Sequence, residues 1–204
     1  MKRRTARTST HAGTLFVSDI FYSVQGEGSL TGRPMVFVRF SGCDLTCAFC
    51  DEPKHRRIRK RMSIDEIVSI VKEYPAHAVY LTGGEPSMQK LIPLIARLKR
   101  SGMFVAVETN GYRFQNIANA DHIVYSPKGK VKRSPLVREM KFIVDERTDV
   151  RGILPYAKKL PVYVQPKARK NVIDKRAVDF CVALVKEHPE LRLSLQTHKY
   201  ARFA

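Results

Sequence analysis

Short apolar runs alternate with segments of helical period from about residue 34 onward. The strand-like runs are rich in β-branched and aromatic residues and cover 35–40, 78–82, 104–108, 122–125, 140–144, 162–165 and 191–195. Between them, apolar residues recur at helical spacing over about 63–74, 87–100, 148–158 and 174–188. This alternation predicts an α/β fold with a mostly parallel sheet covered by helices.

The helix predicted at 63–74 has the clearest start signal. Ser63 and Glu66 have the spacing of a capping box, in which each residue satisfies a backbone N–H of the other. The apolar positions that follow share one face of the helix and are Ile64, Ile67, Val68 and Val71. That face is predicted to pack on the sheet.

The length of the chain limits the barrel that it can form. A closed eight-stranded (β/α) barrel usually takes about 250 residues, whereas this chain has 204. We therefore predict a reduced or partial barrel. Polar or glycine-rich clusters follow the predicted strands at 82–86, 108–110, 126–128, 165–167 and 196–199. Ligands of parallel α/β proteins bind at this end of the strands, so the clusters predict one shared site.

Composition and charge narrow the class of protein. The 37 Lys and Arg residues outnumber the 19 Asp and Glu residues, for a formal net charge of +18. We expect a basic, mobile tail over residues 1–14 and a single domain over 15–204. No apolar run reaches the roughly 18 residues of a membrane span or follows the N-terminal charges as in a signal peptide, which favours a cytoplasmic protein. The charge favours anionic partners and leaves nucleic-acid binding open.

Three cysteines are the strongest candidates for chemistry. Cys43, Cys47 and Cys50 lie within eight residues, directly after the run at 35–40. Three thiolates on one loop can hold three irons of a 4Fe-4S cluster and leave the fourth iron open. Zinc is the alternative, but a closed zinc site needs four ligands, and the nearest extra candidates are His55 and Cys181. Cys181 lies on the apolar face of a predicted helix, where a buried thiol is expected.

A glycine-rich turn ends the run at 78–82. Gly83 and Gly84 allow a ligand to approach the backbone closely, and Glu85 can accept a hydrogen bond from an amine. A plain strand-to-helix turn capped by Ser87 is the alternative, because such residues are common in turns.

The cysteine loop and this turn together resemble the radical S-adenosylmethionine (SAM) superfamily, which has the same cysteine spacing and a similar Gly-Gly-Glu-Pro turn. Other segments resemble one family within it, the 7-carboxy-7-deazaguanine synthases. These segments are 21–28, 32–34, 37–43, 108–111, 126–128 and 196–199. The resemblance spans about residues 19–204, and the Gln-Gly-Glu-Gly opening and the Gln-Thr-His-Lys ending are not general features of the superfamily.

The resemblance implies two cofactors. Cys43, Cys47 and Cys50 would ligate a 4Fe-4S cluster whose open iron binds SAM, and an electron would split the sulfonium to give a 5′-deoxyadenosyl radical. The cofactor would supply the chemistry, while the protein orients it and excludes water. The residues implied to bind SAM are Phe49, Cys50, Asp51, Gly84, Glu85, Thr109, Ser126, Pro127, Lys128, Gln165, Pro166, Lys167 and Ala168.

The resemblance also implies the substrate, 6-carboxy-5,6,7,8-tetrahydropterin, which the family contracts to 7-carboxy-7-deazaguanine with loss of ammonia in queuosine-type 7-deazapurine biosynthesis. Gln25 and Glu27 would bind the amino-pyrimidinone edge, and Arg39 would bind the carboxylate. The full substrate set is Val24, Gln25, Gly26, Glu27, Arg39, Thr82, His198 and the terminal carboxylate of Ala204.

One residue departs from the family pattern. Glu52 stands where the family usually has a Thr that helps to hold Mg²⁺, and we expect its carboxylate to keep a Mg²⁺ site. A homodimer and a flavodoxin- or ferredoxin-like electron donor are the implied partners. Two other functions remain as alternatives, a glycyl-radical-type activating enzyme and a zinc-dependent RNA-binding module.

Overall fold

The computed structural model describes residues 13–168 and 172–201, and within them nine strands form a single sheet. The order across the sheet is β3-β1-β2-β4-β5-β6-β7-β8-β9. The strands are β1 (Thr14–Val24), β2 (Pro34–Phe40), β3 (Lys60–Ser63), β4 (Ala78–Gly83), β5 (Phe104–Thr109), β6 (His122–Tyr125), β7 (Glu139–Val144), β8 (Val162–Pro166) and β9 (Leu191–Leu193).

The sheet is parallel from β2 to β9 and antiparallel at one edge. All six pairs from β2·β4 to β8·β9 are parallel, whereas β1 pairs antiparallel with both β2 and β3. The sheet ends at β3 and β9 without closing. The predicted α/β fold with a partial barrel is therefore confirmed.

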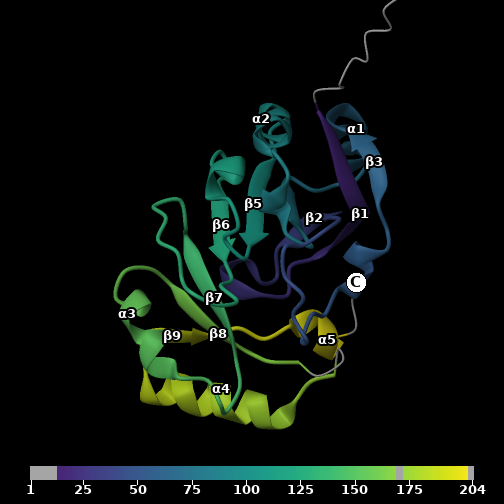
Figure 1. The fold of residues 1–204 in the computed structure, drawn as a ribbon. Helices are drawn as coiled ribbons and strands as arrows, with labels where there is room; N and C mark the ends of the chain where they lie inside the picture. The colour runs from purple at the N-terminus through teal and green to yellow at the C-terminus, as the bar shows by residue number, and fades with distance from the viewer. Residues whose placement is uncertain (1–12, 169–171, 202–204) are drawn as a thin grey trace, which may run out of the picture.

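Helices cover the outside of the curved sheet, with α1 and α2 at the top of Figure 1 and α4 along the bottom. The helices are α1 (Ile64–Lys72), α2 (Ile92–Arg100), α3 (Leu154–Ala157), α4 (Lys175–Glu187) and α5 (Thr197–Ala201). The capping box predicted for α1 is present: Glu66 N–H donates to Ser63 Oγ at 3.2 Å, and Ser63 N–H donates to Glu66 Oε2 at 2.6 Å. No helix of the described ranges is long and apolar enough to cross a membrane.

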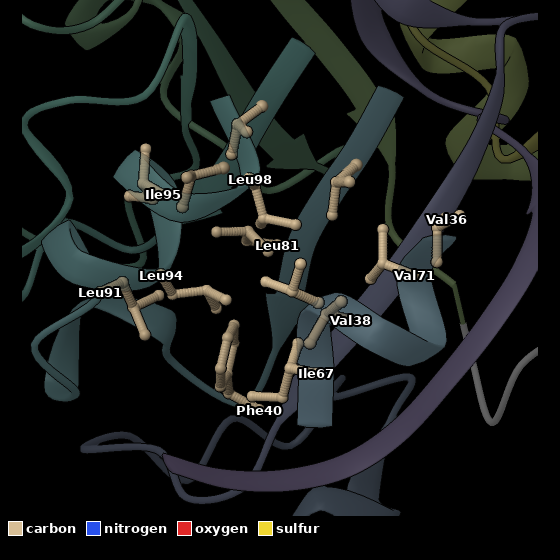
Figure 2. Packing of buried hydrophobic residues seen from close by; sticks show 14 of the residues in the cluster. Val36, Val38, Phe40, Ile67, Val71, Leu81, Leu91, Leu94, Ile95 and Leu98 are labelled. Atoms are coloured by element: carbon tan, nitrogen blue, oxygen red, sulfur yellow. The ribbon is translucent and has the colours of Figure 1, made fainter. Parts of the chain in front are cut away.

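Alternate residues of each strand face opposite sides of the sheet. On β2, Val36, Val38 and Phe40 pack against apolar side chains of α1 and α2 (Figure 2). A second apolar cluster joins β7 and β8 to α4 and includes Cys181, as predicted. The opposite face holds a smaller apolar cluster at the amino ends of the strands, around Met35 and Ala106. This leaves the carboxyl ends of that inner face for polar side chains.

Several elements differ from the prediction. The strands β1 and β3 and the helix α5 were not predicted from the pattern. The helix predicted at 148–158 is a 3₁₀ turn followed by the four-residue α3, because Pro155 lies in its first turn. The helix predicted at 87–100 begins only at Ile92, with Pro93 in its first turn, after a separate 3₁₀ turn. Proline lacks the N–H that would continue a preceding helix, so it starts a new one.

Candidate functional site

A cavity of about 450 Å³ lies at the carboxyl ends of the parallel strands. Arg39 of β2, Thr82 of β4 and Glu108 of β5 line it from neighbouring strands, and Lys141 of β7 and Gln165 of β8 line it further across the sheet. All five occupy the inward-facing positions of their strands. The shared site predicted from the clusters at the strand ends is therefore a single cavity.

The cysteine loop forms one wall of this cavity. Cys43, Cys47 and Cys50 are free thiols, partly exposed, and all three line the cavity. Burial raises the pKa of the Cys43 thiol, so iron would have to displace its proton, as metals do when they bind thiols. Cys181 is buried in the core, where burial raises its pKa to about 12. The three loop thiols fit an iron–sulfur cluster, and Cys181 lies apart from them.

The zinc alternative lacks a complete ligand set. His55 Nε2 lies 3.9 Å from Cys50 Sγ. However, over residues 13–168 and 172–201 no three His, Cys, Asp or Glu side chains are placed to hold one metal ion. In a 4Fe-4S cluster each thiolate binds a different iron, so the thiols need not converge on one point.

The Gly83–Glu85 turn packs directly on the start of the cysteine loop. Gly84 N–H donates to Phe40 O, and Glu85 N–H donates to Gly42 O, both at 2.8 Å. A Cβ atom on Gly84 would lie 1.8 Å from the carbonyl oxygen of Gly42. Gly83 has a φ of +107°, and a Cβ there would meet the backbone of Phe40 at 2.4 Å. The two glycines are therefore required for this close approach.

Glu85 is 1% exposed, and its carboxylate is already engaged by the protein. It accepts from Ser87 N–H at 2.9 Å, from Thr109 Oγ1 at 2.6 Å and from Asn110 N–H at 2.6 Å. Burial nevertheless raises the pKa of Glu85. These bonds hold the turn in place. The hydroxyl proton of Thr109 is used in the bond to Glu85. Contact of either with SAM stays a prediction.

The residues predicted to surround the adenosyl group lie on the far side of the cavity. Lys128 Nζ donates to Ser126 Oγ at 2.7 Å. The ammonium groups of Lys128 and Lys167 lie 5.8 Å and 5.5 Å from the ring centre of Phe49. Burial among the cavity walls lowers the pKa of Lys128, although its side chain remains open to water in the cavity. Phe49 of the cysteine loop therefore lies close to lysines that follow β6 and β8.

The C-terminal helix α5 lies beside the cysteine loop (Figure 1). Gln196, just before it, donates to Glu27 Oε1 and to Asp51 Oδ2, each at 2.8 Å. Lys199 lies 3.5 Å from Asp51. A Cβ on Gly26 would meet His198 Nδ1 at 2.6 Å, so this glycine allows α5 to approach. The two most specific segments of the family resemblance, 25–28 and 196–199, therefore lie together in one wall of the cavity.

A charged cluster, formed by Glu27, Tyr80, Glu108 and Lys141, lies on the inner face of the sheet. The Lys141 ammonium pairs with the carboxylate of Glu27 and lies 2.7 Å from Glu108 Oε1. Tyr80 OH donates to Glu108 Oε2 at 3.0 Å. Burial alone would lower the pKa of Lys141 and raise that of Glu27. Their mutual attraction outweighs burial, so both groups stay charged.

Arg39 and Glu52 form an ion pair with each other at the mouth of the cavity. The Arg39 guanidinium also lies 4.8 Å from the ring centre of Phe21. From the sequence, Arg39 is expected to bind the substrate carboxylate and Glu52 to bind Mg²⁺, as separate roles. The ion pair makes these two roles dependent on each other, because a change in the charge of one residue changes the electrostatic environment of the other.

Most of the predicted site residues line the cavity. They are Val24, Gln25, Gly26, Glu27, Arg39, Cys43, Cys47, Phe49, Cys50, Asp51, Glu52, Thr82, Gly84, Glu85, Thr109, Ser126, Lys128, Gln165, Pro166, Ala168 and His198. Pro127 and Lys167 are not among the lining residues, although Lys167 approaches Phe49. Ala204 lies outside the described residues.

Two residues of the site, Tyr80 and Lys141, were not predicted from the sequence. Glu108, Gln196 and Lys199 belong to the clusters predicted at the strand ends and also line the cavity, but no individual role was predicted for them. A lysine inside an apolar strand is a usable signal, because burying an ammonium is costly without a partner. The identity of that partner depends on the fold.

The comparisons with known proteins agree with this geometry. Residues 37–127 match the family model of the Radical SAM superfamily, and they contain the cysteine loop and the Gly-Gly-Glu turn. A 7-carboxy-7-deazaguanine synthase of Bacteroides thetaiotaomicron is 41% identical over 90% of this chain and 95% of its own length. One of Burkholderia multivorans is 36% identical over 92% of this chain and 98% of its own length.

A solved structure shows the same fold. The crystal structure of QueE from Escherichia coli superposes with a TM-score of 0.74 at 24% identity, over 89% of this chain and 93% of that one. The partial barrel and the three-cysteine loop define a radical SAM protein. Within that superfamily, the chain belongs to the 7-carboxy-7-deazaguanine synthase family.

Proposed function

We propose that this protein converts 6-carboxy-5,6,7,8-tetrahydropterin into 7-carboxy-7-deazaguanine with loss of ammonia, in 7-deazapurine biosynthesis. One observation carries the proposal. The three-cysteine loop and the polar residues expected to bind the pterin line the same cavity, at the carboxyl ends of the strands. A substrate in that cavity would lie next to the cofactors that the family uses.

The cofactors of the superfamily are a 4Fe-4S cluster and SAM, which would supply the radical that starts the reaction once an external donor provides an electron. Cys43, Cys47 and Cys50 would hold the cluster. The Gly83–Glu85 turn would fix the loop from behind. Ser126, Lys128 and the segment 165–168 offer polar groups and apolar contacts for the nucleoside part of SAM.

The remaining polar residues suit a flat heterocycle that carries a carboxylate. Gln25 is 4% exposed, and its backbone is bonded to Gly32 and Arg33, which holds it at the edge of the cavity. Glu27 stays ionised beside Lys141 and can accept from an amino group and a ring N–H. Arg39 can donate to the substrate carboxylate. Burial lowers the pKa of His198, which favours its neutral form as it lies beside Gly26.

Mg²⁺ does not fit the protein residues alone. Glu52 is paired with Arg39, and in the described residues no three or more His, Cys, Asp or Glu side chains are placed to hold a metal ion. A Mg²⁺ ion at Glu52 therefore stays a prediction from the sequence, and no step of the mechanism passes through it. The homodimer, the flavodoxin- or ferredoxin-like donor and the cytoplasmic location are further parts of the proposal.

The charge of the cavity argues against the RNA-binding alternative. Its lining holds four basic residues, Arg39, Lys128, Lys141 and Lys199, against five acidic ones, Glu27, Asp51, Glu52, Glu85 and Glu108. This nearly balanced lining offers a polyanion no excess of positive charge, whereas a small ligand with both donor and acceptor groups would find partners. The glycyl-radical activating alternative has less support, because close relatives along nearly the whole chain are named 7-carboxy-7-deazaguanine synthases.

The test of this function is a single anaerobic reaction. The reconstituted enzyme is incubated with reductant, SAM and the carboxy-tetrahydropterin, and the products are analysed by mass spectrometry. We expect the ring-contracted acid together with one equivalent of ammonia. Cleavage of SAM without a ring-contracted product would keep the radical chemistry and reject the substrate.

A further inference from the structure

The charged cluster of Glu27, Tyr80, Glu108 and Lys141 contains a lysine that cannot serve as an ordinary ligand-binding cation. Lys141 is 2% exposed. The side chains of its two carboxylate partners are more open, with 13% of Glu27 and 22% of Glu108 exposed. The carboxylates therefore border the open space of the cavity, while the ammonium lies between them.

The two carboxylates come from distant parts of the chain and meet only at this lysine. Glu27 follows β1, and Glu108 lies on β5, at the inner face of the sheet. Gln196 holds Glu27 from one side at 2.8 Å, and Tyr80 holds Glu108 from the other at 3.0 Å. Both carboxylates are thus oriented by neutral donors and neutralised in part by one shared cation.

We propose that Lys141 is a positioning residue, which holds Glu27 and Glu108 as two ionised acceptors for the N–H groups of the pterin, and that Glu108 is the second carboxylate to contact the substrate. The inference rests on the proposed function. A reduced pterin carries an amino group and several ring N–H groups, and a carboxylate can accept from them only while it is ionised. A buried cation is the means by which a protein keeps such acceptors ionised in a closed site.

The proposal predicts a pH effect with a definite sign. Burial alone would raise the pKa of Glu27, but the attraction of Lys141 outweighs burial and is the main reason that this pKa is lowered to about 2. The other charged or titratable groups around the cluster are Tyr80, Glu108, Asp51, Lys128, Glu139, His198 and Lys199. Without Lys141, Glu27 takes up a proton at a higher pH and loses its ability to accept. Raising the pH then restores the acceptor.

The experiment compares Lys141→Met with the wild type and with Lys99→Met. Lys99 lies on α2, outside the cavity, and pairs with Asp121 at 2.6 Å. Anaerobic titration calorimetry with SAM present gives the Kd of the carboxy-tetrahydropterin between pH 6 and 8.5. We expect Lys141→Met to bind it about 10- to 150-fold more weakly near neutral pH, the loss typical of a charge-assisted hydrogen bond. The ratio of its Kd to that of the wild type should fall as the pH rises. The Kd of SAM should not change.

Glu108→Gln separates the second contact from the effect of the lysine. The amide keeps the shape of the side chain, and Lys141 still holds Glu27 ionised. We expect weaker pterin binding with the same pH profile as the wild type, and unchanged iron content. Wild-type affinity in Glu108→Gln would overturn the contact, and a wild-type Kd in a folded Lys141→Met would overturn the positioning role.

The remaining outcomes also decide the matter. A loss in Lys141→Met that is independent of pH, with lower iron content, would assign Lys141 to stability alone and overturn the proposal. If Lys141→Met does not fold, Glu108→Gln still tests the contact. If the wild type does not form the ring-contracted acid, the proposed function and this inference both fail. If the wild type is active and the variants bind the pterin as it does, only this inference fails.

Discussion

The two segments that meet at the mouth of the cavity are built in opposite ways. The Gly83–Glu85 turn is fixed by the protein, since its backbone is bonded to Phe40 and Gly42 and the Glu85 carboxylate accepts from three groups. The cysteine loop keeps its three thiols partly exposed on the cavity wall. The turn therefore positions the loop, and the loop exposes its three thiols to a ligand in the cavity.

Removal of a thiol from the cysteine loop should have the largest effect of the substitutions that test this comparison. We expect Cys43→Ala, Cys47→Ala and Cys50→Ala each to abolish assembly of the cluster and cleavage of SAM, because each thiolate holds its own iron. Iron content and the absorbance near 400 nm of anaerobically reconstituted protein measure the loss. Cys181→Ala is the control and should keep its iron. Loss of iron in a folded Cys181→Ala would contradict the assignment of three ligands.

The turn can be broken by adding a single methyl group. In Gly84→Ala the new Cβ would lie 1.8 Å from the carbonyl of Gly42, and backbone cannot move aside as a side chain can. We expect the free energy of unfolding to fall by about 2 kcal/mol or more, as for other overpacked sites. Urea unfolding of the protein without cofactors measures it.

The matched control is Gly129→Ala. A Cβ on Gly129 has no atom within 4 Å, so its free energy of unfolding should change by less than about 0.5 kcal/mol. Equal stability of the two alanine variants would show that the turn is not held as closely as the structure indicates.

Substitution of Arg39 should have a smaller effect, limited to the substrate. Arg39→Ala removes the cation at the mouth of the cavity and leaves the cysteine loop and its turn intact. We expect about 10- to 150-fold weaker pterin binding, the range of a lost charge-assisted hydrogen bond, with little change for SAM. Both constants come from anaerobic titrations. Equal weakening of the two ligands would place Arg39 outside the substrate site.

The fold was predictable where the pattern is local. The parallel strands β2 and β4 to β9 are short apolar runs, and the capping box of α1 needs only Ser63 and Glu66. The strand β1 was missed because polar residues such as Ser18 and Asp19 interrupt its alternation, and the register shifts between Val17 and Asp19. Its position depends on pairing with β2, which local propensity does not encode.

The site was predictable through its motifs, but its interactions were not. Glu27, Arg39 and Glu52 were each identified, yet the pairing of Arg39 with Glu52 depends on the conformation of the loop after β2, and the pairing of Glu27 with Lys141 depends on the packing of distant strands. Lys141 is 114 positions from Glu27. In sequence alone, a lysine among Met140, Phe142 and Val144 is compatible both with a surface position of a strand and with a buried ion pair. Only the fold shows that it is buried beside two carboxylates.

The smallest expected effect concerns Mg²⁺. The sequence led us to expect that the carboxylate of Glu52 would repel an anionic substrate unless a divalent ion lay between them. In the structure Arg39 pairs with Glu52 and supplies a counter-charge that this expectation did not include. The guanidinium has five N–H donors and can bind Glu52 and the substrate carboxylate together. We therefore expect ring contraction to continue in chelator-treated enzyme and to change little as Mg²⁺ is added.

Glu52→Gln sharpens this test. The amide carries no charge, so Arg39 becomes fully available to the substrate carboxylate, and pterin binding should be unchanged or tighter. Anaerobic titration of the pterin with and without Mg²⁺ measures it. A wild type that requires Mg²⁺, together with a Glu52→Gln variant that has lost the response, would restore the metal site predicted from the sequence. A response to Mg²⁺ that is the same in both proteins would place the ion away from Glu52, and the Arg39–Glu52 pair would remain as the charge balance at the mouth of the cavity.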